Sequence, residues 1–224
     1  MRGDQSSIPG RFRDRAHAGR CLGSLLSGYA RRDDVVVLAL ARGGVPVGLE
    51  IARMLGAPLE VFVVRKLGVP GHEELAFGAL ASGGVRVLNQ DVVRQLGLRS
   101  NLIDAISDRE RGELERRERL YRGERLPIAL SGRTVIVVDD GLATGASMRA
   151  AIAAVRVQAP ARIVVAVPTA AAETCSLLRT EVDELVSPLT PEKFQAVSLW
   201  YDYFEQLTDA DVRELLEKAE EIDR

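Results

Sequence analysis

The sequence predicts an α/β fold in which helices flank a mostly parallel sheet, with a small appendage made by the two ends of the chain. Strand-like and helix-like patterns alternate along most of its length, which is typical of a sheet built from repeated strand–helix units. The run "DVVVLAL" over 34–40 is continuously apolar, as expected of a strand that is buried on both faces. With 224 residues, the chain can form one domain with an ample core.

The first half of the chain begins with a helical stripe of apolar residues that includes Phe12 and Leu22. Glycine and proline are dense from residue 67 onward, so we expect an open loop there. In order, the expected elements are a helix over 11–30, a strand over 34–40, a helix over 44–57, a strand over 58–66, and a long loop leading to a short hairpin over 67–85.

A long helix over about residues 100–121 carries the charge run "DRERGELERRERLYRGER". Glutamate alternates with arginine in it, which favours a solvated face with local ion pairs over a nucleic-acid site. The whole chain has 30 lysines and arginines against 32 aspartates and glutamates. No overall positive field therefore draws it to nucleic acid or to an anionic membrane, and we expect neither as a partner.

The second half continues the alternation and then departs from it at residues 190–207, which hold half of the chain's aromatic residues outside any clear strand. Thr208 is a plausible N-cap for a closing helix. The expected elements are a strand over 135–138, a helix over 145–157, a strand over 162–168, a helix over 170–180, a strand over 182–188 and a helix over 208–222. We divide the chain into a flexible tail over 1–10 and a single domain over 11–224, with its core at about 34–170 and a possible hood at 187–207.

Two further observations exclude other classes of protein. Cys21 and Cys175 form no C-x-x-C pair, so the sequence offers neither a disulfide framework nor a zinc site. The first ten residues lack the apolar core of a secretory signal, and no apolar run is long enough to span a bilayer. We therefore expect a cytoplasmic protein.

The stretch "VIVVDDGLATGAS" combines an apolar strand with chemistry that a stable core does not need. Gly141 and Gly145 let the backbone approach a ligand closely. Thr144, Gly145, Ala146 and Ser147 come at the start of the next helix, where unpaired N–H groups and the helix dipole favour an anion such as phosphate.

Asp139 and Asp140 repel phosphate but suit neighbouring hydroxyl groups, such as a cis-diol, which can donate hydrogen bonds to them. A phosphate a few ångströms from a diol describes a ribose 5-phosphate. The alternative is a tight turn whose aspartates merely cap the helix, but one cap would not need both acids, Thr-Gly and Ser together. No lysine is present for a Walker A loop, and the glycine spacing does not fit a dinucleotide fingerprint.

This stretch resembles the phosphoribosyl pyrophosphate signature of type I phosphoribosyltransferases, and the resemblance is complete across residues 135–147. It implies that Asp139 and Asp140 bind the ribose hydroxyls and that Ala143, Thr144, Gly145, Ala146 and Ser147 wrap the 5-phosphate. Oxopurine-type members carry an aspartate at the position of Ala143, and its absence weakens a hypoxanthine or guanine assignment. It does not establish adenine, because the rest of the chain does not look like an adenine enzyme.

The resemblance extends to "LALARGGVPVG", which looks like the pyrophosphate loop of these enzymes. Ala41, Arg42, Gly43 and Gly44 would form that loop, with Arg42 facing the diphosphate and the glycine N–H groups supporting it. The family often holds this loop in a cis form that is not followed by proline.

The segment "VRKLGVPGHEELAFGAL" stands where the family has its mobile catalytic loop. Arg65 and Lys66 would neutralise the leaving group, or else they are surface charges that close a strand. Glu74, or its neighbour Glu73, could supply a general base, or else begin the next segment. His72 is expected in a turn. We expect residues 66–74 to be mobile and to close over the reacting centre.

The ends of the chain resemble a bacterial subgroup of stand-alone phosphoribosyltransferases with undefined substrate, through the pattern "FQAVSLWYDYF". Phe194, Trp200, Tyr201 and Tyr203 could stack on a nucleobase, although at most one of Trp200 and Tyr201 is expected to do so. The other interpretation is a core or dimer contact for this segment.

The resemblance implies transfer of a 5-phosphoribosyl group from phosphoribosyl pyrophosphate to a nitrogen acceptor, a nucleobase in the simplest case, with release of pyrophosphate. Mg²⁺ would arrive mainly through the ligand, since the sequence offers no dedicated metal cage. We expect a homodimer. A non-catalytic sensor of the donor or of a nucleotide is the alternative, and a ribose-phosphate hydrolase would need a positioned base that the sequence does not clearly supply.

Overall fold

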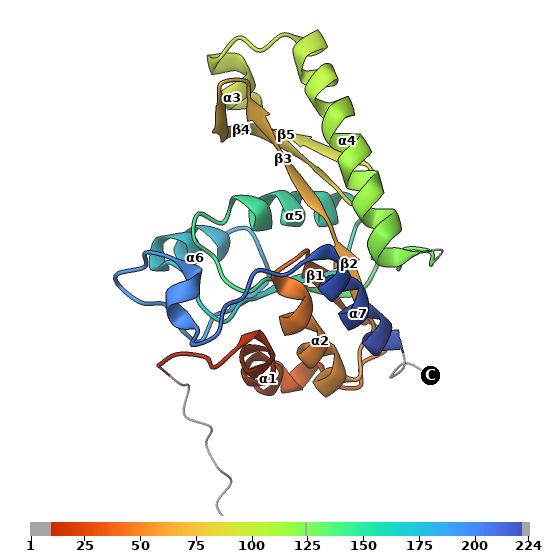
Figure 1. Cartoon of the computed structure of the whole chain (residues 1–224), viewed down its shortest axis with the longest axis vertical. Helices are drawn as coiled ribbons and strands as arrows, with labels where there is room; N and C mark the ends of the chain where they lie inside the picture. Colours follow the sequence, from red (N-terminus) through yellow and green to blue (C-terminus); the bar gives the residue numbers. More distant parts are fainter. Residues whose placement is uncertain (1–9, 124, 221–224) are drawn as a thin grey trace, which may run out of the picture.

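The main sheet of the protein contains five parallel strands in the order β2-β1-β6-β7-β8 (Figure 1). The computed structural model describes residues 10–123 and 125–220, and of Glu73, Glu74 and Glu220 it describes the backbone alone. The strands are β1 (Val35–Leu40), β2 (Leu59–Phe62), β6 (Thr134–Val138), β7 (Arg162–Ala166) and β8 (Glu184–Val186). The α/β class with a parallel sheet flanked by helices is therefore confirmed.

Alternate residues of each central strand enter two different cores, because successive side chains point to opposite faces of a sheet. On one face, residues such as Val37 and Ile136 pack under α1 (Arg15–Leu25), α2 (Gly44–Leu55) and α7 (Asp209–Glu220). On the other, residues such as Leu38 and Val137 pack under α5 (Ala146–Val157) and α6 (Ala172–Leu178). Both faces being covered explains the continuously apolar strands.

A second, antiparallel sheet contains β3 (Val64–Val69), β4 (His72–Ala81) and β5 (Val85–Leu88), and it stands beyond α5 in Figure 1. The single strand expected over 58–66 was wrong, because the chain leaves the main sheet after Phe62. The open loop expected from residue 67 was also wrong. Residues 64–69 pair with 72–81 around a turn at Pro70 and Gly71, where Gly71 adopts a φ of 78° that suits glycine.

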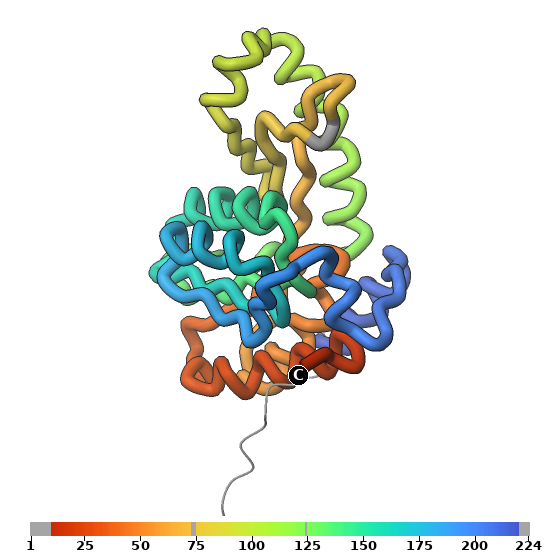
Figure 2. The backbone as a smooth tube through the Cα atoms, turned by 90° about the vertical axis from the view of Figure 1, so that its left-hand side faces the viewer, coloured from red at the N-terminus to blue at the C-terminus, as the bar shows by residue number. Residues whose placement is uncertain are grey.

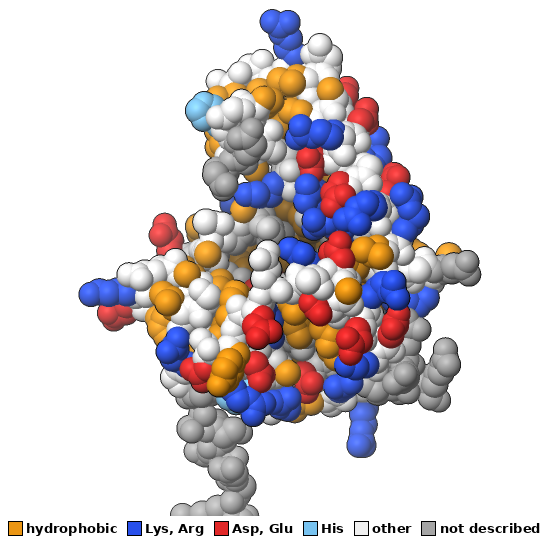
Figure 3. All heavy atoms as spheres, viewed as in Figure 1, with side chains coloured by type: hydrophobic (Ala, Val, Ile, Leu, Met, Phe, Trp, Pro, Cys, Tyr) orange, Lys and Arg blue, Asp and Glu red, His pale blue; other side chains and the backbone are white. Residues whose placement is uncertain are grey.

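Two helices complete this second unit: α3 (Gln90–Gln95), which the pattern did not predict, and the long α4 (Ser100–Arg122), which it did. Acidic and basic side chains are interspersed along α4 (Figure 3). Pairs such as Arg116–Glu113 and Arg117–Glu113 lie three and four residues apart, as local ion pairs on a helix must. The alternating acidic and basic residues thus pair with one another along the helix.

Phe12 and Arg13, near the start of the described chain, lie beside residues 200–203 of the C-terminal segment (Figure 2). Phe12 N–H donates to the carbonyl of Trp200, and Asp202 N–H donates to the carbonyl of Phe12. The short helix η2 (Val197–Trp200) ends at this pairing, and the short helix η1 (Ser27–Tyr29) follows α1. Apart from Gly10, the tail expected over 1–10 lies outside the described residues.

The closing helix α7 begins directly after Thr208, which was expected to be its N-cap. Thr208 Oγ accepts from the N–H of Asp211 at 3.2 Å, and the Asp211 carboxylate accepts from the N–H of Thr208 at 2.7 Å. These reciprocal bonds are those of a capping box. Within the described part of the chain, no helix is long and apolar enough to cross a membrane.

Candidate functional site

The carboxyl ends of the paired strands β1 and β6 bring two glycine-rich loops together. Ala39 is in register with Val138, so residues 41–44 and 139–147 leave the same edge of the sheet. The loops touch through glycine: a Cβ on Gly43 would lie 2.1 Å from Asp140 Oδ2, and one on Gly44 would lie 2.5 Å from the Val138 carbonyl oxygen. Any larger residue would separate the loops.

The first loop holds a cis peptide bond between Ala41 and Arg42, followed directly by the first turn of α2. Arg42 is partly exposed, and its Nη1 lies 3.9 Å from Asp209 Oδ1 at the start of α7. A partly exposed guanidinium beside the start of a helix is suited to an anion.

The second loop begins with the acid pair, both members of which are partly buried. Asp139 Oδ1 accepts a hydrogen bond from the Asp140 N–H at 2.9 Å. Burial, followed by the neighbouring Asp140 charge, raises the pKa of Asp139 well above its ordinary value. Burial also raises the pKa of Asp140, and the nearby Arg15 guanidinium opposes that rise.

The rest of the second loop presents small exposed residues at the start of α5. Ala143, Thr144, Ala146 and Ser147 are exposed, and Gly145 adopts a φ of 71° at the N-cap of the helix. A Cβ on Gly145 would meet Thr174 at 2.6 Å, and Thr174 Oγ also donates to the Ala143 carbonyl. The Ala146 N–H donates to Thr144 Oγ at 3.5 Å, and the exposed start of this twelve-residue helix is suited to an anion.

A cavity of about 290 Å³ lies beside the acid pair. Arg42, Gly43 and Asp140 line it, as do residues 204–207 of the C-terminal segment and Arg15 of α1. Arg15 Nε donates to Asp140 Oδ2 at 2.8 Å. No local sequence signal points to Arg15, because its partner lies 125 residues away along the chain.

The residues expected in a catalytic loop are strand residues here. Arg65, on β3, donates to Glu110 of α4 at 2.7 and 3.0 Å, so its guanidinium is held against that helix. Lys66 is exposed on the same strand. Glu74 lies on β4, and its side chain is outside the described atoms, as is that of Glu73.

The aromatic residues of the C-terminal segment take different positions. Tyr201 is 2% exposed, packs against Phe12 and Phe204, and donates its hydroxyl to the Asp140 carbonyl at 2.6 Å. That position supports the loop and does not offer a ring face for stacking. Phe194 and Trp200 are half-buried, and Tyr203 is exposed.

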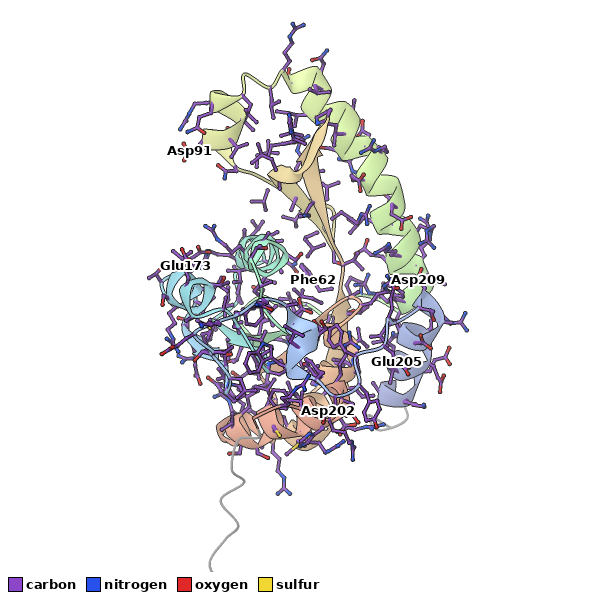
Figure 4. The ribbon with its side chains drawn as sticks, turned by 60° about the vertical axis from the view of Figure 1, so that its left-hand side comes forward. Phe62, Asp91, Glu173, Asp202, Glu205 and Asp209 are labelled. Atoms are coloured by element: carbon purple, nitrogen blue, oxygen red, sulfur yellow. The ribbon has the colours of Figure 1, made fainter. Side chains whose placement is uncertain are left out.

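A second polar cluster, which the sequence pattern did not reveal, ties Arg42 to the long helix. Asp209 accepts from the Tyr121 hydroxyl at 2.5 Å and from Arg116 at 3.4 Å, and both partners lie on α4. The Tyr121 hydrogen bond, with Arg116 adding to it, holds the pKa of Asp209 below its ordinary value. Figure 4 shows Asp209 where α7 meets the end of α4.

A dedicated metal site is not found among residues whose side chains are described, since no three His, Cys, Asp or Glu groups converge there. The groups that the site offers are a pair of carboxylates beside a loop suited to an anion. Such a set fits Mg²⁺ that is carried by a diphosphate and keeps part of its water, as hard cations do in phosphate sites.

The fold and the two loops together define a class of site: an acid pair and an anion cradle at the carboxyl edge of a parallel sheet. The family model for the phosphoribosyl transferase domain matches residues 71–202. The chain therefore belongs to the phosphoribosyltransferase family, a family of transferases.

The relatives agree with this assignment. A Mycobacterium tuberculosis protein named "Putative phosphoribosyl transferase" is 45% identical over 208 residues, which are 93% of this chain and 47% of that protein. The chain thus spans about half the length of the curated relatives it matches. The crystal structure of TT1426 from Thermus thermophilus is 42% identical, covers 93% of this chain and 98% of its own, and superposes with a TM-score of 0.83. At 13% identity and a TM-score of 0.50, AQ2163 from Aquifex aeolicus shares the fold alone.

Proposed function

We propose that the protein transfers the 5-phosphoribosyl group of phosphoribosyl pyrophosphate to a nitrogen nucleophile, a nucleobase in the simplest case, and releases pyrophosphate. The observation that carries this proposal is the contact between the two loops through Gly43 and Asp140. It places the loop of Arg42 against the acid pair, and the start of α5 follows the acid pair in the same loop. These three parts would take the diphosphate, the ribose hydroxyls and the 5-phosphate of the donor.

The roles of the residues follow from their chemistry. Asp139 and Asp140 would accept hydrogen bonds from the ribose hydroxyls, and the exposed start of α5 at residues 144–147 would hold the 5-phosphate. Arg42 and the N–H groups of Gly43 and Gly44 would stabilise the negative charge that develops on the leaving diphosphate. Members of the family generally use Mg²⁺. Here it would be bound chiefly by the donor's diphosphate and would neutralise part of that charge.

The transferred group would pass through a transition state that resembles an oxocarbenium ion, which water can trap. The chain must therefore exclude water, and the hairpin of β3 and β4 is our candidate for a cover. Lys66 on that hairpin would add positive charge near the diphosphate when the hairpin closes, and Glu74 would supply a base.

A non-catalytic sensor of the donor is the second candidate, and one observation favours it. The Arg65 guanidinium is bound by Glu110 on α4, so it already has an anionic partner. A sensor needs the acid pair and the phosphate cradle but no second cation for a leaving group.

An activity assay separates the two candidates. The intact protein is incubated with phosphoribosyl pyrophosphate, Mg²⁺ and a panel of nucleobases, and pyrophosphate release is scored. A transferase should release pyrophosphate with at least one base, and Arg42→Gln should abolish most of that release. Arg53→Gln is the matched control, because Arg53 lies in the last turn of α2 and pairs with Glu50 away from the site.

Donor binding without pyrophosphate release from any base would favour the sensor. A homodimer is also part of the proposal. Sedimentation equilibrium should then give about twice the chain mass of 24.4 kDa, and a single-chain mass would contradict it.

A further inference from the structure

Arg15 makes three polar or ring contacts at the edge of the acid pair. Its Nε donates to Asp140 Oδ2 at 2.8 Å, and its Nη1 donates to the Glu205 carbonyl at 2.8 Å. Its guanidinium carbon lies 3.8 Å from the ring centroid of Phe204. The side chain of Arg15 is 11% exposed and that of Asp140 is 14% exposed. The guanidinium is thus fixed on one face by a ring and on two edges by acceptors.

Asp140 is also surrounded by other groups. Asp139 precedes it and adds a like charge, and Arg42 lines the same cavity. Gly43 packs directly against its carboxylate. Tyr201 donates its hydroxyl to the Asp140 carbonyl. Among the described residues, Arg15 is the one cation whose ion pair with Asp140 is closer than 4 Å.

We propose that Arg15 is a positioning residue of the donor site, holding the Asp140 carboxylate in place against Gly43 so that the acid pair can receive the ribose hydroxyls. The proposal rests on the proposed function, because it concerns the same donor. It adds a residue that lies outside the matched segment 71–202 and that no motif predicts.

Two physical effects support this role. A carboxylate with one ordered cation loses its freedom to rotate away from the ligand, and a preorganised site binds more tightly. The Arg15 charge also opposes the rise that burial gives to the pKa of both acids. Without it, a proton should stay on the pair at higher pH, and a protonated carboxyl accepts fewer hydrogen bonds.

The contacts that hold Arg15 come from the far end of the chain. The Glu205 carbonyl and the Phe204 ring lie on the C-terminal segment, which pairs with the N-terminal segment through Phe12 and Trp200. Glu205 is labelled in Figure 4 between η2 and α7. The appendage made by the two ends of the chain therefore belongs to the proposed donor site.

The test compares Arg15→Met with Arg20→Met. Methionine keeps the apolar contact with Phe204 and removes the charge. Arg20 is the matched control, since it lies on the same helix and pairs with Glu50 outside the site. In the ligand-free proteins, ¹³C NMR of the aspartate carboxyl groups follows the titration of the acid pair. Calorimetry with phosphoribosyl pyrophosphate and Mg²⁺ at several pH values follows binding.

Arg15→Met should move the titration of the pair upward by about one pH unit or more. It should weaken donor binding at neutral pH at least about tenfold, as the loss of a charged hydrogen bond implies. The loss should be smaller at higher pH, where both acids are ionised. Arg20→Met should change neither property. Arg15→Lys, which keeps the charge without the planar fork, should restore the titration more fully than the affinity.

The outcomes separate this inference from the function. A wild-type protein that does not bind the donor overturns the proposed function, while the carboxyl titration still tests the hold of Arg15 on Asp140. A wild type that binds, with Arg15→Met binding equally well, overturns the inference alone. An unchanged titration in Arg15→Met overturns it as well. If Arg15→Met does not fold, Arg15→Lys decides by the same criterion: unchanged donor affinity overturns the inference.

Discussion

Asp139 and Asp140 place two like charges side by side in a partly buried loop, an arrangement that opposes folding. Because the pKa of Asp139 is raised in the folded protein, its ionised form is disfavoured there relative to the unfolded chain. Folding stability is therefore reduced at any pH at which this carboxyl ionises. The pair is better explained by a ligand than by the fold.

We predict that Asp139→Asn leaves the protein at least as stable as the wild type at neutral pH. The amide oxygen can still accept the Asp140 N–H, and the unfavourable charge is gone. A gain of about 1 kcal/mol would raise the melting temperature by roughly 2–4 °C in a chain of this size. Calorimetric melting checks this.

The sign of the pH dependence gives a second readout for the same variant. A raised carboxyl pKa favours the folded state when the group is protonated, so wild-type stability should gain on the variant as pH falls from neutral toward the unfolded value of about 4. A variant that is less stable than the wild type at neutral pH would contradict the account.

Gly43 is predicted to be intolerant of even a methyl group. An alanine Cβ there would lie 2.1 Å from the Asp140 carboxylate, so Gly43→Ala should push the loops apart and cost about 1–3 kcal/mol of unfolding free energy. Gly28→Ala is the control, since a Cβ on Gly28 meets nothing within 4 Å. Urea titration of both variants measures the difference, and equal stabilities would show that the loops are not in contact.

The sequence indicates candidate site residues when the residues that work together are neighbours in the chain. It does not indicate residues whose partners lie far away in the chain. The acid pair, Gly145 and the loop at Arg42 follow strand ends, where local pattern suffices. Arg15 looks like an ordinary helix arginine until its partner 125 residues away is known. For Tyr201 the sequence left two interpretations, stacking on a base or a core contact, and its burial against Phe12, far away in the sequence, supports the core contact.

Among the elements, the hairpin of β3 and β4 shows how far local pattern can mislead. Gly68, Pro70 and Gly71 suggested an open loop, yet residues 64–69 are paired along their length, with register shifts around Gly68. Leu67 and Leu80 are fully buried, in the core that includes residues of α4. That tertiary packing outweighs the poor strand propensity of glycine and proline. β1, which is apolar throughout and buried, offered no such ambiguity.

The hairpin is the element that we expect to respond to the donor. Its turn at Pro70 and Gly71 is exposed, and the turn has few apolar anchors, so local opening should be easy in the free protein. Although residues 66–69 are paired with β4, hydrogen exchange followed by mass spectrometry should be faster over residues 66–74 than over β7. Donor with Mg²⁺ should slow it. The peptide that covers β7 serves as a reference, because its strand is central and buried.

Slow exchange at residues 66–74 in the free protein, unchanged by the donor, would argue against closure. It would also strengthen the sensor as the alternative function, because binding alone needs no cover over the reacting centre.

At the level of the whole molecule, the parallel sheet supplies the two loops, and the ends of the chain complete the proposed site from outside the sheet. The α/β class followed from the alternation of strand and helix patterns. The way the N- and C-terminal segments pair was not predictable, because their contacts, such as Phe12 with Trp200, are isolated and follow no repeating pattern. Sequence periodicity reports regular elements, and the appendage is irregular.

The central claim is that residues 139–147 bind a 5-phosphoribosyl compound, and one calorimetric comparison tests it directly. Phosphoribosyl pyrophosphate with Mg²⁺ is titrated into the wild type, into Asp139→Asn with Asp140→Asn, and into Asp33→Asn with Asp34→Asn. The last is a matched control, an adjacent acid pair at the amino end of β1. We predict that the wild type and the control bind the donor while the 139/140 variant, still folded, binds it much more weakly. Equal donor affinity in all three proteins would contradict the claim.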